Sequence, residues 1–151
     1  MMMENRMYKR ILIATDGSEL AAKAVSAGLR LADALGSELV ALMVTSADPG
    51  TVVAGPLVVV APPEAFDEAK AFAERTLKTI KEAAKGAGIP CDPVHIVSEF
   101  PPRAILDTAA DKSCDLIVMA SHGRGGLKAL VLGSVTREVL AHSTLPVLVC
   151  R

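Results

Sequence analysis

Five short apolar runs alternate with stretches of helical periodicity, and this alternation restricts the fold more than any other feature of the chain. Most of the runs are continuously apolar, which is typical of strands that are buried on both faces. They are RILIAT (10–15), ELVALMV (38–44), PVHIV (93–97), DLIVMA (115–120) and LPVLVC (145–150). A chain of this kind predicts an α/β fold with a parallel sheet and right-handed crossovers.

The four segments between the runs repeat apolar residues at steps of three and four, as amphipathic helices do. Ser18 is the expected N-cap of the first helix and Gly36 its stop signal. From the N-terminus, the four helical segments are Ser18 to Gly36, Phe66 to Ala84, Pro101 to Ala109 and Ser134 to Leu140. We therefore expect residues 1–151 to form one doubly wound, Rossmann-like domain with helices on both faces of the sheet.

The composition of the runs also predicts the order of the strands. Runs 10–15 and 115–120 are the most uniformly apolar and belong in the centre of the sheet. His95 and Pro146 lie in the third and fifth runs, and such residues are tolerated best in edge strands. The predicted order is 3-2-1-4-5, which opens a ligand crevice between the first and fourth strands at their carboxyl ends.

Charge and composition exclude several classes of partner. The formal net charge is −1 with both signs interspersed, so the chain lacks the basic face that neutralises nucleic-acid phosphates. The three cysteines are widely spaced without a C-x-x-C pair. This spacing favours reduced thiols that pack in the core over ligands of a metal site. Since no apolar run approaches the ~20 residues of a membrane span, we expect a cytoplasmic protein that binds neither nucleic acid nor membrane.

The segment 45–63 does not fit the alternation. It is too long for an ordinary connection and too apolar for a solvated one. A lid over a ligand, a packing flap and an oligomer contact are all compatible with its composition.

Two polar stretches lie where the predicted crevice opens. Asp16 follows the first strand, and Gly123 begins a glycine cluster after the fourth. Gly133 and Ser134 then open the last helix, whose N-terminus carries partial positive charge. Glycines let backbone N–H groups approach a phosphate. A turn followed by an ordinary helix cap would give the same sequence pattern without a phosphate site. Neither the P-loop nor the G-x-G-x-x-G pattern is present.

These stretches resemble the ATP-binding branch of the universal stress protein family, and the likeness covers almost the whole chain. The family pattern G-x2-G-x9-G-[ST] corresponds here to Ala120, Gly123, Gly133 and Ser134. Alanine thus stands at the first glycine of the pattern, where its methyl group adds bulk beside a ribose or phosphate.

The resemblance implies a nucleotide site drawn from four segments of the chain. The residues expected to contact nucleoside are Ala14, Thr15, Asp16, Val44, Met119 and Ala120. The residues expected to contact the phosphates are Gly123, Gly133, Ser134, Val135 and Thr136, with Arg124 as a neighbour of compatible charge. His122 is expected either to order its turn or to touch the ligand.

The resemblance further implies a regulatory stress-response protein that binds ATP, with or without Mg²⁺, and forms a homodimer by antiparallel pairing of strand 145–150. Asp16 is the only acid placed near the nucleotide, so we expect no catalytic residue and at most slow ATP hydrolysis. A protein-interaction module without a nucleotide and a cyclic-nucleotide binder are the alternatives. A phosphorylated receiver is disfavoured because the acidic pair and lysine of receivers are missing.

Overall fold

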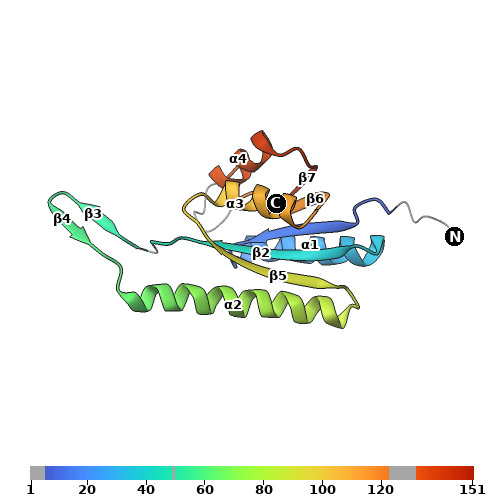
Figure 1. Ribbon diagram of the computed structural model, residues 1–151, viewed down its shortest axis with the longest axis horizontal. Helices are drawn as coiled ribbons and strands as arrows, with labels where there is room; N and C mark the ends of the chain where they lie inside the picture. The colour runs from blue at the N-terminus through green and yellow to red at the C-terminus, as the bar shows by residue number, and fades with distance from the viewer. Residues whose placement is uncertain (1–5, 49, 123–131) are drawn as a thin grey trace.

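The computed structural model describes residues 6–48, 50–122 and 132–151. Its main sheet consists of five parallel strands in the order β5-β2-β1-β6-β7 (Figure 1). The strands of this sheet are β1 (Arg10–Thr15), β2 (Glu38–Thr45), β5 (Cys91–Val97), β6 (Leu116–Ala120) and β7 (Val147–Cys150). Numbered within this sheet alone, the order is 3-2-1-4-5, and the prediction from the sequence is confirmed.

The four predicted helices are also present. Ser18 caps the first of them, because its Oγ accepts a hydrogen bond from the Ala21 N–H at 3.2 Å. Gly36 ends the same helix in the left-handed conformation, with φ of 67°. The helices are α1 (Glu19–Leu35), α2 (Pro63–Gly86), α3 (Pro101–Asp111) and α4 (Ser134–His142).

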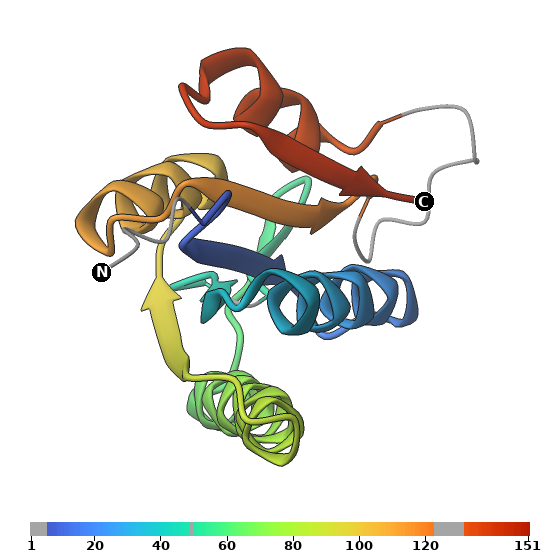
Figure 2. The same ribbon diagram turned by 90° about the vertical axis from the view of Figure 1, so that its right-hand side faces the viewer.

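Helices cover both faces of the sheet, with α1 and α2 on one side and α3 and α4 on the other (Figure 2). Successive residues of β1 point to opposite faces. Ile11 and Ile13 pack in the cluster that contains the α1 alanines, whereas Leu12 packs with Ile105 of α3 and Val139 of α4. Burial on both faces explains why the central strands are continuously apolar.

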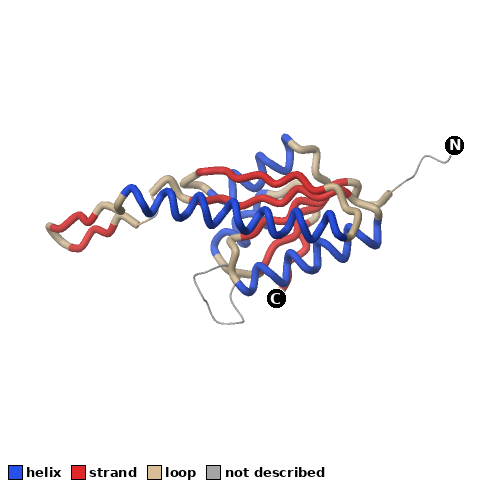
Figure 3. The backbone as a smooth tube through the Cα atoms, turned by 90° about the horizontal axis from the view of Figure 1, so that it is seen from below, coloured by secondary structure: helices blue, strands red, loops and turns tan. Residues whose placement is uncertain are grey.

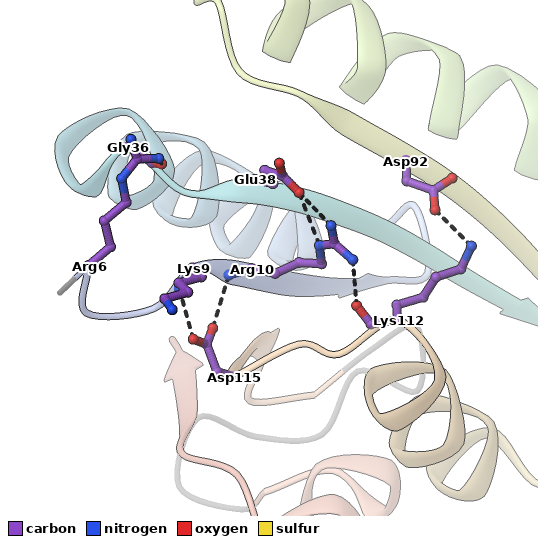
Figure 4. Close-up of polar contacts among 8 residues, drawn as sticks. All are labelled: Arg6, Lys9, Arg10, Gly36, Glu38, Asp92, Lys112 and Asp115. Atoms are coloured by element: carbon purple, nitrogen blue, oxygen red, sulfur yellow. Dashed lines mark hydrogen bonds and ion pairs between the residues drawn. The ribbon is translucent and has the colours of Figure 1, made fainter. Parts of the chain in front are cut away.

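A polar network joins the strands at their amino ends, opposite the predicted crevice (Figure 4). The Asp115 carboxylate accepts hydrogen bonds from the N–H groups of Lys9, at 2.8 Å, and Arg10, at 3.0 Å. The Arg10 guanidinium in turn donates to the Glu38 carboxylate and to the carbonyl oxygen of Lys112. These contacts connect the beginnings of β1, β2 and β6.

Part of the segment 45–63, which does not fit the alternation of strands and helices, forms regular secondary structure that the sequence did not predict. It contains an antiparallel hairpin of β3 (Val52–Ala54) and β4 (Leu57–Val59). Gly55 has φ of 59°, the positive value that the first residue of a tight hairpin turn requires. The hairpin projects beyond the carboxyl end of the main sheet (Figures 1 and 3). Two β-branched runs around Gly-Pro were the sequence signal for it.

None of the helices in the described part of the chain has the length and apolar character needed to cross a bilayer.

Candidate functional site

A pocket opens at the carboxyl ends of β1, β2 and β6, on the face of the sheet covered by α3 and α4. This is the crevice position expected for the strand order, because the chain leaves β1 and β6 toward opposite faces. Of the twelve residues expected from the sequence at the nucleotide, eight line the pocket: Ala14, Thr15, Asp16, Val44, Met119, Ala120, Val135 and Thr136.

The turn after β1 holds Asp16 at the edge of the pocket. The Asp16 Oδ1 accepts a hydrogen bond from the Ser18 N–H at 2.9 Å, and the Thr15 Oγ1 accepts one from the Gly17 N–H at 3.1 Å. Asp and Thr side chains form such local turns readily. The same turn therefore fixes Asp16 and presents Ser18 as the cap of α1.

Two hydrogen bonds fasten the beginning of α4 to the end of β6. The Gly133 N–H donates to the Ser121 carbonyl oxygen at 2.7 Å, and the buried Thr136 hydroxyl donates to the Ala120 carbonyl oxygen at 2.8 Å. A Cβ at position 133 would lie 3.0 Å from the Cα of His122, so only glycine fits this approach without displacing the backbone. The two flanks of segment 123–131 are thereby held together.

Some of the residues named from the sequence do not line the pocket, and others lie outside the described residues. Gly133 and Ser134 precede the lining residues of α4 but do not themselves line the pocket. Gly123 and Arg124 lie outside the described residues. Thr136 lines the pocket, but its hydroxyl proton is already donated to Ala120, so Thr136 serves as a fastener between α4 and β6.

Other lining residues were not identified from the sequence. Leu42 lies two residues before Val44 on the same strand, so the period of two could have indicated it. Pro101 and Ile105 reach the pocket from α3, and Ala21 from α1. Their contribution depends on how these helices pack, which no local pattern specified.

His122 both lines the pocket and orders its turn. Its Nδ1 shares a hydrogen bond of 3.0 Å with the Ser121 Oγ. Thus the two roles considered for this residue are compatible with each other.

The lining combines an apolar floor with polar groups at one side. Leu42, Ile105 and Met119 form a surface suited to a flat aromatic base, and Thr15 and Asp16 lie beside it with hydrogen-bonding groups. Helix α4 points its N-terminus at the pocket, and its N-cap Gly133 provides no side-chain cap. The first N–H groups of a helix have no intrahelical partners, so this end favours an anion.

Within residues 6–48, 50–122 and 132–151, no group of three or more His, Cys, Asp or Glu side chains is placed to hold a metal ion. Burial raises the pKa of each of the three thiols above its ordinary value, to about 11 for Cys114. The cysteines therefore stay protonated at neutral pH, which disfavours metal binding.

Sequence comparisons connect the chain with one family. The model of the universal stress protein family matches residues 7–151. The universal stress protein YxiE of Bacillus subtilis is 35% identical over 149 residues, which cover 96% of this chain and 100% of that protein. A universal stress protein of Thermus aquaticus is 35% identical over 146 residues, with the same two coverages.

Solved structures show the same fold. MJ0577 of Methanocaldococcus jannaschii superposes with a TM-score of 0.70 at 28% identity, over 95% of this chain and 96% of that one. A universal stress protein in complex with cAMP has a TM-score of 0.70 at 24% identity, over 95% and 97%. A universal stress protein of Archaeoglobus fulgidus in complex with dAMP has a TM-score of 0.61 at 23% identity, over 95% and 98%.

Proposed function

This chain belongs to the universal stress protein family, and from that premise we propose that its pocket binds an adenine nucleotide, ATP foremost, as part of a regulatory stress response in the cytoplasm. The observation that carries the proposal is the pairing, in one pocket, of an apolar floor with a helix N-terminus whose N-cap, Gly133, has no side chain to cap it. The floor accepts a base, and the helix end accepts phosphate. The cAMP and dAMP complexes of structural neighbours support the adenine class.

The orientation of the ligand follows from charge. Asp16 carries the one carboxylate among the described lining residues, so it disfavours phosphate and favours the donors of a ribose or base. Val135 and Thr136 lie in the first turn of α4, where the helix field favours an anion. The proposed nucleotide therefore lies with its nucleoside toward β1 and its phosphates toward α4.

The proposed role is regulatory binding with little turnover. Fast phosphoryl transfer requires a positioned nucleophile, charge-stabilising groups and usually metal ions. Asp16 is a single carboxylate, and its Oδ1 already accepts the Ser18 N–H. Any Mg²⁺ would be bound largely by the phosphates themselves, with Asp16 as the one described lining carboxylate near it.

A titration of nucleotide-stripped protein tests the proposal. We expect ATP with Mg²⁺ to give saturable heat near one site per chain, under conditions that detect a Kd of about 100 µM, or about −5.5 kcal/mol. The same titration with cAMP tests the cyclic-nucleotide alternative. If cAMP binds more tightly than ATP, the cyclic nucleotide becomes the proposed ligand in place of ATP. Flat traces with both would contradict the proposal and leave a protein-interaction module of the same fold.

A charge-matched pair of variants tests the phosphate position. Val135→Glu places a carboxylate in the first turn of α4, where the helix dipole favours a negative charge, at a half-buried residue that packs against the core. Val135→Gln has nearly the same shape without the charge. We expect the glutamate to weaken ATP binding by about tenfold relative to the glutamine, or about 1.4 kcal/mol. Equal affinities would place the phosphates elsewhere.

We also propose that the chain forms a homodimer through β7. This strand ends the sheet and pairs only with β6 among the described strands, so its outer edge is open to a second chain. Antiparallel pairing with the same strand of a partner would close that edge. A monomer at micromolar concentration in sedimentation analysis would contradict this arrangement.

A further inference from the structure

The turn that places Asp16 at the pocket is covered on its other side by α2. Asp16 lines the pocket, whereas the next residue, Gly17, lies against the side chains of Phe72 and Thr76. A Cβ built on Gly17 would lie 2.5 Å from the Phe72 Cζ, 2.6 Å from its Cε1 and 3.4 Å from the Thr76 Oγ1. The aromatic ring therefore occupies the space that any other side chain at position 17 would need.

The contact between the ring and Gly17 depends on the conformation of the turn. Gly17 has φ of 78°, a left-handed value that residues with a Cβ rarely adopt. Its N–H donates to the Thr15 Oγ1 at 3.1 Å, and the following N–H, that of Ser18, donates to the Asp16 Oδ1 at 2.9 Å. Thr15 and Asp16 both line the pocket. A shift of Gly17 would therefore alter both polar side chains that this turn contributes to the site.

Phe72 is held in place by the packing of α2 on the sheet. Phe72 and Thr76 are four residues apart on α2 and so lie on the same side of the helix. The Phe72 side chain is half-buried and packs against a buried cluster of residues from β2 and α2: Ala41, Met43, Ala73, Leu77 and Ile80. Because a close-packed interior resists displacement, the ring is a fixed surface against which the turn rests.

We propose that Phe72 is a positioning residue of the nucleotide site, which acts through Gly17 on Asp16. The inference rests on the proposed function, in which the Asp16 carboxylate accepts hydrogen bonds from the nucleoside. With the ring in place, the carboxylate meets the ligand in one orientation. Without the ring, binding must also order the turn, and that cost lowers the affinity. Phe72 itself does not line the pocket, so its effect on the ligand passes through the turn.

Phe72→Leu removes the contact and keeps an apolar side chain on α2. The ring atoms nearest to Gly17 are Cζ and Cε1, and a leucine side chain ends at its Cδ atoms before either position is reached. Calorimetric titration with ATP and Mg²⁺ should show binding weakened on the order of fivefold. Phe66→Leu makes the same change on the same helix, at a residue that is 43% exposed, and should leave the affinity unchanged. Urea denaturation verifies that both variants are folded.

A double-mutant cycle with Asp16→Asn separates positioning from a general loss of structure. The asparagine keeps an oxygen for the Ser18 N–H and replaces the other carboxylate oxygen with a donor, which cannot accept from the nucleoside. Since Phe72 acts through Asp16, Phe72→Leu should weaken ATP binding by less than about twofold further in the Asp16→Asn chain. Losses that multiply in the double variant would overturn the proposal, because the ring would then support the site without Asp16.

Amide hydrogen exchange provides a readout that needs no ligand. We expect the Ser18 N–H, which is bonded to Asp16, to exchange faster in Phe72→Leu than in the parent chain, by a larger factor than the amides of β6. An unchanged Ser18 rate, or full ATP affinity in Phe72→Leu, would overturn this inference alone. A parent chain that binds no nucleotide would overturn the proposed function, and with it the role of Phe72 at a ligand site.

Discussion

The Thr136 hydroxyl donates a 2.8 Å hydrogen bond to the Ala120 carbonyl oxygen, sixteen residues earlier in the chain. Thr136 is in the first turn of α4, and Ala120 is the last residue of β6. The bond thus connects the helix that faces the proposed phosphate position with the strand at the centre of the crevice. Because Thr136 is 2% exposed, water does not compete for this interaction.

Replacing Thr136 with valine removes this bond and keeps the shape of the side chain. We expect Thr136→Val to lower the free energy of unfolding by about 1 kcal/mol, the usual net value of a hydrogen bond. Thr136→Ser keeps the hydroxyl and serves as the control. Urea denaturation measures both variants. A valine variant as stable as the parent chain would mean that the hydroxyl does not fasten α4 to β6.

Gly133→Ala places a methyl group 3.0 Å from the Cα and Cβ of His122. The backbone must move to accommodate it, so we expect a loss of about 1–3 kcal/mol in stability together with weaker ATP binding. Gly86→Ala is the matched control, because nothing lies within 4 Å of a Cβ there and the residue ends a helix. Calorimetric titration and urea denaturation give the two readouts. Unchanged ATP affinity in a folded Gly133→Ala protein would remove position 133 from the site.

At the amino ends of the strands, Asp115→Asn removes a charge that accepts two backbone N–H groups. Charge-assisted bonds of this type are stronger than neutral ones, so we expect a loss of about 1–3 kcal/mol. Asp107→Asn is the comparison, since among the described residues that carboxylate forms an exposed i,i+4 pair with Arg103, worth about 0.5 kcal/mol or less. Thermal and urea denaturation should rank Asp115→Asn well below Asp107→Asn, and equal stabilities would contradict the proposed contribution of the network.

Alkaline pH should destabilise the fold through Cys114. Burial raises the pKa of this thiol to about 11, above its ordinary value of 9.0. The folded chain therefore holds the proton more tightly than the unfolded chain, so this contribution is complete below about pH 9 and is lost as the pH rises toward 11.

The test compares the parent chain with Cys114→Ala in urea at several pH values. Between pH 8.5 and 10.5 we expect the parent chain to lose about 1–2 kcal/mol more than the variant. Using the difference between the two proteins cancels the titration of lysines and of the other two thiols. Parallel stability curves would show that Cys114 titrates alike in the folded and unfolded chains.

The strand order and the helix ends could be predicted because they depend on local composition. Continuous apolar runs indicated buried strands, and His95 and Pro146 placed two of them at the edges. Ser18 and Gly36 marked the limits of α1, where capping requires particular residues. The hairpin was missed because its strands are only three residues long and are read as a single apolar stretch.

By itself, the sequence determined an α/β fold, a crevice at the carboxyl ends of β1 and β6, and most of the residues at its edge, since each follows a recognisable strand or begins a helix. Only the tertiary structure decided that Leu42, Pro101 and Ile105 complete the pocket and that the Thr136 hydroxyl is committed to Ala120. The physical reason is that these contacts join residues far apart in the chain. Side-chain packing between helices and strands leaves no periodic pattern in the local sequence from which it could be predicted.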